Sequence, residues 1–576
     1  MQVNNIKCHS KTLLYITLFF CVTSVSGFLP TAGAQSCIAP MDIPLYLSGG
    51  FGELRNNHFH SGIDFKTQGK TGIPVKSVKG GYVSRIFVSP WGYGRALYID
   101  HPDGTTTVYG HLERFNDAIE SFTLDSQYIK QSFKVDLYLS AKQFPVKQGT
   151  VIAYSGNTGG SSAPHLHFEL RKTSTQEVQD PLMLYKKMVQ DVRPPQIQSI
   201  MVYPKEGQGV IGGKSAKQII SLKKNQKGKV VPSPTLQVWG KIGFAIKAYD
   251  YMSGTKNIYG VKDITLKVDG NMIFRSLIDH FSFEETRYLN SFIDWKEWVY
   301  RKSFYMKSFI EPGNKLNIYR SKGDGFFDFN EERDYLLSYL LKDSHGNTSV
   351  FDFTVQGKKQ TIPTVHPSGT FFPCDQDNVY EKDGLTLTVP RGNLYTDVYF
   401  SYDKTVYHAA YSPLYNSPLY KINENIPLHT PCPLSIAVID DRLAQKEKYG
   451  LISVQRGKEQ WIGGDYREGK IYATVKELSS FTVAIDTTPP LIRALKPESW
   501  SNNKKISFRV IDSSSGIASW TASLNDEFAL FELDGKNNHL YCTFDARRMK
   551  PGKNILQLIV RDACGNETTF NDTIYW

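Results

Sequence analysis

The sequence predicts a mostly β protein, with a compact antiparallel β-sheet domain near the N-terminus and β-sandwich (Ig-like) modules after it. Short apolar runs separated by glycine-rich turns predict strands in the N-terminal part. A strand–turn pattern that occurs twice predicts sandwich repeats farther along the chain. Aromatic residues make up 13% of the sequence, and they favour strands. The length of 576 residues allows about four domains.

The predicted sheet domain covers residues 38–190. Its apolar runs have the length of strands and end at turn residues; they are Gly80–Val83, Ala96–Ile99, Thr107–Tyr109 and Val151–Tyr154. The segment Phe115–Phe144 is more polar and has fewer turn residues. We expect it to be an insertion that forms a helix and then a strand at Val135–Tyr138.

Two proline pairs, Pro194-Pro195 and Pro489-Pro490, mark linkers, because consecutive prolines favour an extended chain. After each linker come a strand that ends in Asp, a Ser-Gly turn, and a closing strand with an Asp-x-x-Gly-Asn turn. The repeat predicts Ig-like β-sandwiches at 193–358 and 486–576. Residues 360–485 form a further β-rich module, in which Leu385–Val389 alternates as a half-buried strand does. Spacer or adhesion modules that bind cell wall or glycan are the expected role of these three units.

Composition excludes several classes of protein. Hydrophobic residues make up 40% and charged residues 21%, which excludes a collagen-like or wholly disordered chain. The formal net charge of +11 suits an anionic partner, such as an acidic cell-wall polymer or membrane face. No arginine-rich tract or nucleic-acid-binding motif is present, so nucleic acid is not an expected partner.

The N-terminus has the layout of a secretory signal peptide at 1–34. Lys7 and Lys11 precede an apolar run from Leu13 to Val25, and small residues lead to an expected cleavage after Ala34. The protein is therefore expected to be exported to the periplasm, the cell envelope or the extracellular space. A lipid anchor at Cys37 is the weaker alternative. No later segment has 18 consecutive apolar residues, so no transmembrane segment is expected after signal removal.

Five cysteines follow the signal peptide, and export permits disulfides. Cys374 with Cys432, and Cys542 with Cys564, are hypothetical pairs because each lies within one predicted domain. Sequence alone does not decide the connectivity. No CxxC pair exists, which excludes a cysteine zinc ribbon.

Three segments carry residues that suit metal chemistry. The first is the run from His58 to Asp64, which contains His60 and Gly62. The second is a predicted strand from His165, on which His165, His167 and Glu169 share one face while Leu166, Phe168 and Leu170 pack inward. Gly156–Pro164 before it is a glycine-rich turn that admits close approach of a substrate backbone. The third is Tyr109–Leu112, in which His111 ends a strand.

The ordered combination of these three motifs resembles the lysostaphin-type (LytM-like) zinc metallopeptidases. The resemblance covers about residues 45–190, and further matches include Gly80–Val83, Gly92–Gly94, His101–Gly104 and Val146–Gly149. It implies that His60, Asp64 and His167 are ligands of one catalytic Zn²⁺. It also implies that His111 and His165 are catalytic histidines, and that the substrate is a peptide of peptidoglycan, in a cross-link or a stem.

The chemistry of the residues agrees with this resemblance. Two histidines and one aspartate leave a fourth zinc position for water, as in catalytic sites. One free histidine can move a proton and the other can stabilise the oxyanion, and which does which stays open. His58 and His101 are not expected in the site. Glu169 is expected to be a structural carboxylate, with the alternative that it orients a histidine.

The long gap from His111 to His165 departs from compact members of the family. The extra residues near 115–144 are expected to form a wall or flap beside the groove. Three other functions remain open: a non-catalytic cell-wall-binding regulator of another murein hydrolase, an endopeptidase acting on Gly-rich proteins, and a glycan- or surface-binding protein with a vestigial enzyme. The presence of all three ligands and both histidines favours an active enzyme.

Overall fold

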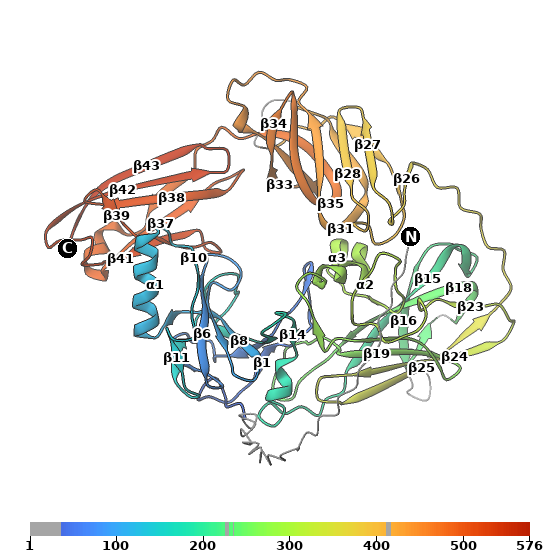
Figure 1. Ribbon diagram of the computed structural model, residues 1–576. Helices are drawn as coiled ribbons and strands as arrows, with labels where there is room; N and C mark the ends of the chain where they lie inside the picture. Colours follow the sequence, from blue (N-terminus) through green and yellow to red (C-terminus); the bar gives the residue numbers. More distant parts are fainter. Residues whose placement is uncertain (1–35, 225–229, 234, 411–415) are drawn as a thin grey trace, which may run out of the picture. The chain divides into compact units, whose positions relative to one another are not determined.

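The computed structural model describes residues 36–576 except 225–229, 234 and 411–415. The predicted signal peptide at 1–34 lies outside the described residues. The protein is mostly β, as the sequence predicts, and its strands fall into four regions that follow one another along the chain (Figure 1). Among the described residues, no helix has both the length and the apolar character needed to cross a membrane.

The first region holds the three motifs. Its strands are β1 (Leu47–Gly49), β2 (Leu54–Arg55), β3 (His58–Phe59), β4 (Ile63–Lys66), β5 (Pro74–Lys76), β6 (Gly81–Val88), β7 (Arg95–Asp100), β8 (Thr105–Leu112), β9 (Arg114–Phe115), β10 (Val135–Tyr138), β11 (Pro145–Val146), β12 (Val151–Tyr154), β13 (His165–Lys172) and β14 (Val178–Gln179), with helices α1 (Asp117–Ile129) and η1 (Pro181–Leu184). The main sheet has the order β1-β4-β13-β8-β7-β6-β10, and its pairs are antiparallel.

The strands that carry the motifs lie together at the centre of this sheet. Strand β13 pairs with β4 on one side and with β8 on the other. On β13, Leu166 and Phe168 are fully buried in the core that also contains Ile63 and Phe65 of β4. Alternate residues of β13 therefore face the opposite side of the sheet.

The predicted insertion has the expected helix and strand. Helix α1 begins after Asn116, whose side chain accepts a hydrogen bond from the Ile119 backbone N–H, as an N-cap does. Ile119, Thr123 and Gln127 recur every four residues and form its buried face. Strand β10 covers the predicted residues and pairs with β6 at the edge of the sheet.

The second region forms one hydrogen-bonded sheet with the main order β17-β16-β15-β18-β25-β24-β19-β20. Its strands are β15 (Gln196–Ile211), β16 (Gln218–Lys224), β17 (Val230–Ser233), β18 (Leu236–Tyr249), β19 (Asp263–Val268), β20 (Asn271–Leu277), β21 (His280–Phe281), β22 (Met306–Lys307), β23 (Phe327–Phe329), β24 (Asp334–Lys342) and β25 (Thr348–Gly357), with helices η2 (Thr286–Tyr288), α2 (Leu289–Phe292) and α3 (Trp295–Arg301). Strand β21 pairs with β14 of the first region, so the two regions share hydrogen bonds.

The third region has its own core and a sheet with the main order β27-β28-β31-β35-β32-β33. Its elements are β26 (Thr370–Phe372), β27 (Asn378–Lys382), β28 (Leu385–Val389), β29 (Val398–Phe400), β30 (Tyr402–Thr405), β31 (Leu419–Ala437), η3 (Lys446–Lys448), β32 (Tyr449–Gln455), β33 (Lys458–Gly463), β34 (Asp465–Arg467) and β35 (Lys470–Ile485). Strand β28 has the predicted alternation, with its first, third and fifth residues buried.

The fourth region consists of two four-stranded sheets, β36-β37-β41-β40 and β39-β38-β42-β43, that contribute to one core. Its elements are β36 (Leu491–Ala494), η4 (Pro497–Ser499), α4 (Trp500–Asn503), β37 (Lys505–Ile511), β38 (Ile517–Leu524), β39 (Glu527–Phe528), β40 (Glu532–Asp534), β41 (His539–Thr543), β42 (Lys553–Asp562) and β43 (Glu567–Tyr575).

The two hypothetical disulfides are wrong, because all five described cysteines are free. Cys542 lies on β41, whereas Cys564 follows β42, which belongs to the other sheet of the fourth region. Cys432 is fully buried and its Sγ accepts a hydrogen bond of 2.8 Å from the Asn393 side chain. The four buried thiols, of Cys374, Cys432, Cys542 and Cys564, therefore serve as small core residues.

Candidate active site

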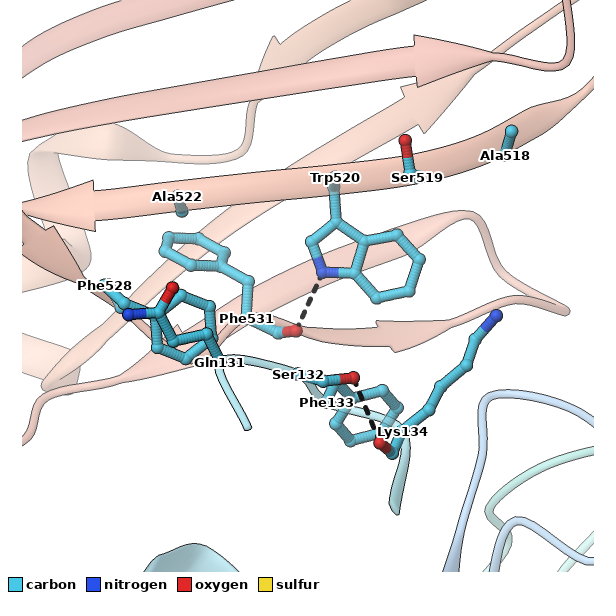
Figure 2. Close-up of a pocket in the computed structure, with 11 residues that line it drawn as sticks. Gln131, Ser132, Phe133, Lys134, Ala518, Ser519, Trp520, Ala522, Phe528 and Phe531 are labelled. Atoms are coloured by element: carbon cyan, nitrogen blue, oxygen red, sulfur yellow. Dashed lines mark hydrogen bonds between the residues drawn. The ribbon is translucent and has the colours of Figure 1, made fainter. Parts of the chain in front are cut away.

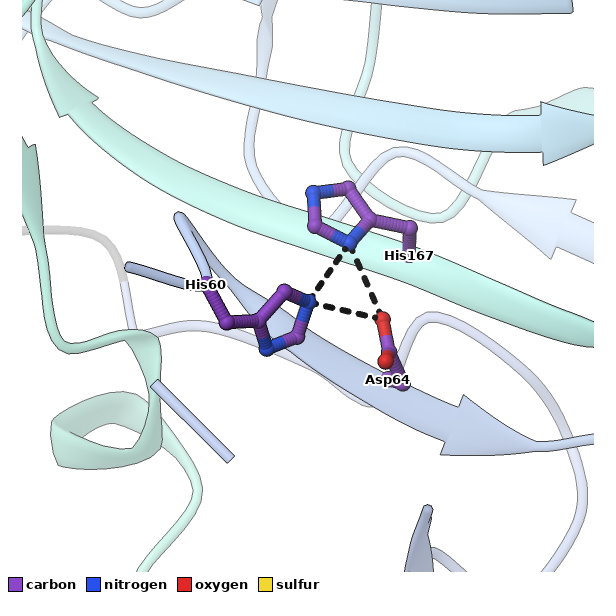
Figure 3. A group of neighbouring side chains, drawn as sticks. All are labelled: His60, Asp64 and His167. Carbon is purple, nitrogen blue, oxygen red and sulfur yellow. Dashed lines mark hydrogen bonds and ion pairs between the residues drawn. The ribbon is translucent and has the colours of Figure 1, made fainter. Parts of the chain in front are cut away.

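Pairing of β4 with β13 brings the predicted ligands together. The register places His167 opposite Asp64, although 103 residues separate them in the chain. His60 lies just before β4 and reaches the same point. Figure 3 shows the three side chains converging from these two segments.

The converging atoms form a small triangle. His60 Nε2 lies 3.1 Å from Asp64 Oδ1 and 3.1 Å from His167 Nδ1, and His167 Nδ1 lies 2.9 Å from Asp64 Oδ1. All three residues are buried. A cation with short bonds to nitrogen and oxygen suits this separation of donor atoms.

The ring nitrogens that face away from the triangle are held by hydrogen-bond acceptors. His60 Nδ1 donates to the Gly50 carbonyl at 2.7 Å, and His167 Nε2 donates to Glu169 Oε1 at 2.9 Å. A carbonyl oxygen can only accept, so His60 Nδ1 carries a proton. When the ring is neutral, its lone pair is therefore on Nε2, which faces the triangle. The Gly50 carbonyl and the Glu169 carboxylate thus hold the two imidazole rings in the orientation that a metal ligand requires.

The two predicted catalytic histidines stand beside the triangle. The rings of His111 and His165 lie 4.7 Å apart, and His165 Nε2 lies 3.5 Å from Asp64 Oδ1. His111 Nδ1 donates to the Thr158 carbonyl and His165 Nδ1 to the Ala163 carbonyl, both at 2.8 Å. In their neutral forms both rings therefore have a free lone pair on Nε2. His111 also has a left-handed backbone, with φ of 58°, which is a strained conformation typical of functional positions.

Glu169 lies within hydrogen-bond distance of His167, which fits the alternative that it orients a histidine. It is fully buried, and besides His167 it accepts hydrogen bonds from Ser61 Oγ at 2.5 Å and Tyr93 Oη at 2.6 Å. Arg171 supplies the countercharge, with its Nε 2.6 Å from Oε2. Alternation along β13 places residues 167, 169 and 171 on one face, which is the sequence signal for this network.

Burial and neighbouring charges set the protonation of the site. Burial alone would raise the pKa of Asp64, but the charge of His60 and hydrogen bonds from the three surrounding histidines hold it well below its usual value. Burial also opposes a charge on His167, yet Asp64 and Glu169 raise its pKa to about 9. Burial, together with His167 and His165, lowers the pKa of His111 to about 3. Without a metal, a proton on His167 therefore lies where a cation could bind.

The triangle opens into a groove of about 860 Å³. Its lining includes the end of the glycine-rich turn, from Gly160 to Pro164, as the sequence predicts. Residues of the second region, Asn257, Phe283 and Thr286, also line it, and sequence reasoning missed them. Tyr93 was missed as well, although it lies in the Gly92–Gly94 match that supported the resemblance.

The other two histidines near the motifs contribute no atom to the triangle. His58 lies at the groove, exposed, with Nδ1 2.9 Å from the Asn56 carbonyl oxygen. His101 is buried, and its two ring nitrogens contact the Gly80 carbonyl and Thr107 Oγ1.

The insertion at 115–144 does not flank the groove, so that expectation is wrong. Strand β10 is at the edge of the main sheet, with β8, β7 and β6 between it and β13. The loop after α1 instead lines a separate small cavity together with residues of β38, where Phe133 and Lys134 lie near Trp520 (Figure 2). In that cavity the Trp520 indole N–H donates to the Phe531 carbonyl.

The chain matches known families in two places. Residues 58–135 and 124–181 match Peptidase family M23, and residues 369–486 match the Zu5-like domain. DD-carboxypeptidase/endopeptidase Mpg of Neisseria meningitidis serogroup B is 32% identical over 118 residues, which is 20% of this chain and 21% of Mpg. Lysostaphin of Staphylococcus simulans is 29% identical over 134 residues, which is 23% of this chain and 22% of lysostaphin.

A solved structure, the catalytic domain of lysostaphin from Staphylococcus simulans, is 28% identical and covers 25% of this chain and 92% of that domain, with a TM-score of 0.19. The chain thus spans about a fifth of the length of the curated relatives it matches. The sequence matches coincide with the sheet that carries the histidines and Asp64. The first region of this chain is therefore a lysostaphin-like (LytM-like) peptidase domain of family M23, followed by further β-sheet domains, one of them Zu5-like.

Proposed function

We propose that this protein is an exported, zinc-dependent endopeptidase that hydrolyses peptide bonds in peptidoglycan cross-links or stems. The observation that carries the proposal is the buried triangle of His60, Asp64 and His167, with two further histidines facing it. We also propose domains at 38–190, 193–358, 360–485 and 486–576. These domain boundaries are supported by the hydrophobic core that each of the four regions has.

The donor set fits zinc. Two imidazole nitrogens and one carboxylate oxygen are zinc ligands, and three protein ligands are typical of a catalytic site. The hydrogen bond from His60 to Gly50, and that from His167 to Glu169, leave the inner nitrogen of each ring available once His167 loses its extra proton. Zinc bound there would polarise a peptide carbonyl and acidify water.

His111 and His165 supply proton transfer. The lowered pKa of His111 keeps its Nε2 unprotonated at neutral pH, so it can accept a proton from the attacking water. Return of a proton to the leaving amine completes hydrolysis, and the second histidine can donate to the developing oxyanion when it is protonated. The carbonyls of Thr158 and Ala163 keep both rings turned toward the groove.

Three observations support a peptidoglycan substrate. Mpg is a carboxypeptidase and endopeptidase by name, and the ALE-1 relative of Staphylococcus capitis is a glycyl-glycine endopeptidase. The groove has a volume of about 860 Å³, within the usual range of ligand-binding pockets. The net charge of +11, which becomes +9 once Lys7 and Lys11 are removed with the predicted signal peptide, favours an anionic wall polymer.

Digestion of purified sacculi by the full chain tests the function. We expect cleavage that a chelator abolishes and zinc restores, with the cut bond identified by mass spectrometry of the fragments. His167→Ala should lose both bound zinc and activity. His165→Ala should keep zinc and lose at least about 100-fold in rate, since loss of a proton-transfer group or of an oxyanion donor costs on that scale. His366→Ala, at an exposed position, is the matched control and should keep both.

Specific outcomes would contradict the proposal. Release of zinc by His165→Ala would show that the ligand assignment is wrong. Binding of well-folded, zinc-loaded protein to sacculi without any cleavage would favour the non-catalytic regulator. Cleavage of Gly-rich proteins but not of sacculi would favour the other peptidase function.

A further inference from the structure

Two groups of three aspartates lie outside the peptidase groove, and they resemble each other. One oxygen from each member lies within 4.8 Å of the others in both groups. The first trio, named here the second-region trio, is Asp191, Asp250 and Asp343. The second, named the fourth-region trio, is Asp486, Asp512 and Asp562.

The two trios occupy equivalent places in the repeat that the sequence contains. The first member of each stands in the linker, three residues before a Pro-Pro pair. The second member directly follows a strand, β18 or β37. The third begins the closing Asp-x-x-Gly-Asn turn at the end of β24 or β42. Three chain segments therefore meet at the point where the chain enters each repeat.

The asparagine of the closing turn makes two corresponding hydrogen bonds in the two trios. In the second-region trio, Asn347 Nδ2 donates to Asp343 Oδ2 at 2.8 Å and to the Asp191 backbone carbonyl at 3.2 Å. In the fourth-region trio, Asn566 Nδ2 donates to Asp562 Oδ2 at 2.7 Å and to the Asp486 backbone carbonyl at 3.1 Å.

The serine of the Ser-Gly turn donates its backbone N–H to the linker aspartate in both trios, at 2.8 Å from Ser253 and 3.1 Å from Ser515. The hydrogen bonds that the six carboxylates accept come from backbone N–H groups, a serine hydroxyl and asparagine amides. All of these donors are neutral, so they bring no countercharge.

One carboxylate oxygen in each trio is buried and has no hydrogen-bond partner. It is Oδ1 of the aspartate that follows the strand, Asp250 or Asp512. Asp250 is only 2% exposed. An orphaned carboxylate oxygen is costly in a protein interior, because it has lost its water without a replacement. Its position beside two other carboxylates points to a missing positive partner.

Burial and the neighbouring carboxylates raise the pKa of the aspartate that follows the strand in each trio. Burial, and next to it the Asp343 carboxylate, raises the pKa of Asp250 to about 7. Burial also raises the pKa of Asp512, with smaller contributions from Asp486 and Asp562. The charge of Arg193 lowers the pKa of Asp250 in part. Crowded carboxylates nevertheless favour uptake of a proton or a cation at each trio.

We propose that each trio binds a hard divalent cation, Ca²⁺, that ties the linker to two loops of the repeat. All the candidate metal ligands in each trio are carboxylate oxygens, which suit Ca²⁺ or Mg²⁺. The ligands in the peptidase groove differ, because two of them are histidine nitrogens. Three protein carboxylates favour Ca²⁺, because Mg²⁺ keeps several waters and uses one or two carboxylates. The occurrence of the same arrangement in two repeats makes an accidental cluster a poor explanation.

Titration of the metal-depleted full chain with Ca²⁺ tests both trios. Calorimetry measures the number of ions bound, and thermal unfolding measures the change in stability. We expect two Ca²⁺ ions per chain and a rise in Tm. Asp250→Asn and Asp512→Asn should each bind one ion, and the double variant none. Mg²⁺ at the same concentration should bind more weakly.

Matched controls separate this site from others. Asp352→Asn, on β25 of the second region, and the exposed Asp572→Asn, on β43 of the fourth, should keep both ions. His167→Ala should also keep both, which separates the trios from the peptidase site. Equilibrium dialysis of the unmutated chain with radioactive Ca²⁺ gives the stoichiometry even if an aspartate variant does not fold.

Two results would overturn the proposal. One is the absence of Ca²⁺ binding by the unmutated chain at millimolar concentration. The other is a stoichiometry that the Asp250 and Asp512 substitutions leave unchanged. A higher Tm for Asp250→Asn than for the unmutated chain, with no effect of Ca²⁺ on either, would assign a shared proton to the trio instead.

Discussion

At the scale of residues, the candidate active site depends on what lies behind each imidazole. His60, His111 and His165 each turn one ring nitrogen to a backbone carbonyl, and His167 turns one to Glu169. The carbonyls are part of the surrounding backbone, so they hold the three rings before any substrate arrives. Such preorganisation reduces the cost of arranging the groups during the reaction.

Protonation of His167 should couple zinc binding to pH. Its pKa is raised from 6.5 to about 9 in the folded, metal-free protein. A raised histidine pKa stabilises the fold fully below pH 6.5, and this contribution, roughly 3 kcal/mol, is lost as pH rises through 9. Zinc must displace the same proton, so we expect zinc affinity to rise about tenfold per pH unit between 6.5 and 9.

Zinc competition titrations and chemical denaturation of metal-free protein across this range measure both effects. His167→Ala serves as the control for stability and should lack this decline. Zinc affinity that is independent of pH between 6.5 and 9 would contradict the proton on His167.

At the scale of elements, the antiparallel pair β4–β13 determines the ligand geometry. Gly62 allows this pair to approach closely: a Cβ there would lie 2.3 Å from the Phe168 carbonyl oxygen and 2.9 Å from Glu169 Cγ. The role of Gly62 is therefore to leave space for the backbone of β13.

We expect Gly62→Ala to push β4 away from β13 and to separate His60 and Asp64 from His167. The free energy of unfolding should fall by about 1–3 kcal/mol, as for overpacked sites, and zinc affinity should fall with it. Denaturant unfolding and zinc titration measure the two effects. Gly323→Ala, where a Cβ meets nothing within 4 Å, is the control. Unchanged zinc affinity in a folded Gly62→Ala protein would contradict this account.

Helix α1 should contribute to stability without contributing to the reaction. Asn116→Ala removes the N-cap hydrogen bond to the Ile119 N–H and should cost about 1 kcal/mol of stability. Because neither Asn116 nor any residue of α1 lines the groove, kcat and KM should stay unchanged. Denaturant unfolding and sacculus digestion test the two halves of this prediction. A loss of activity larger than the loss of folded protein would place α1 nearer the reaction than the structure does.

At the scale of the whole molecule, the peptidase groove has walls from two regions. Asn257 and Phe283 of the second region line it, and Asn257 Nδ2 donates to the Ser48 carbonyl of the first. Among the described residues that line the groove, none comes from the third or fourth region. The second region is therefore the part of the chain placed to influence substrate choice.

Phe283 should affect substrate binding more than chemistry. It is 42% exposed at the groove and packs against the Arg171 guanidinium, 4.6 Å from the ring centre. We expect Phe283→Ala to raise KM about 5- to 100-fold, the equivalent of about 1–3 kcal/mol, with zinc content unchanged. Phe371→Ala, 49% exposed in the third region, is the control. A KM equal to that of the unmutated chain would show that the second region does not contact the substrate.

Features that depend on near neighbours in the chain can be predicted from the amino-acid sequence. These are the mostly β fold, the alternation that puts His165, His167 and Glu169 on one face, and the helix and strand of the insertion. They follow from side-chain periodicity, turn residues and capping, all of which act over a few residues.

Which distant segments meet follows from the packing of the folded chain and cannot be predicted from local patterns. Strand order brought His60 and Asp64 to His167, moved the insertion to the far edge of the sheet, and kept the cysteines apart. It also placed Phe283 at the groove and gathered each aspartate trio from three separate segments. Pairing between strands far apart in sequence results from packing of the whole core, and no local pattern specifies it.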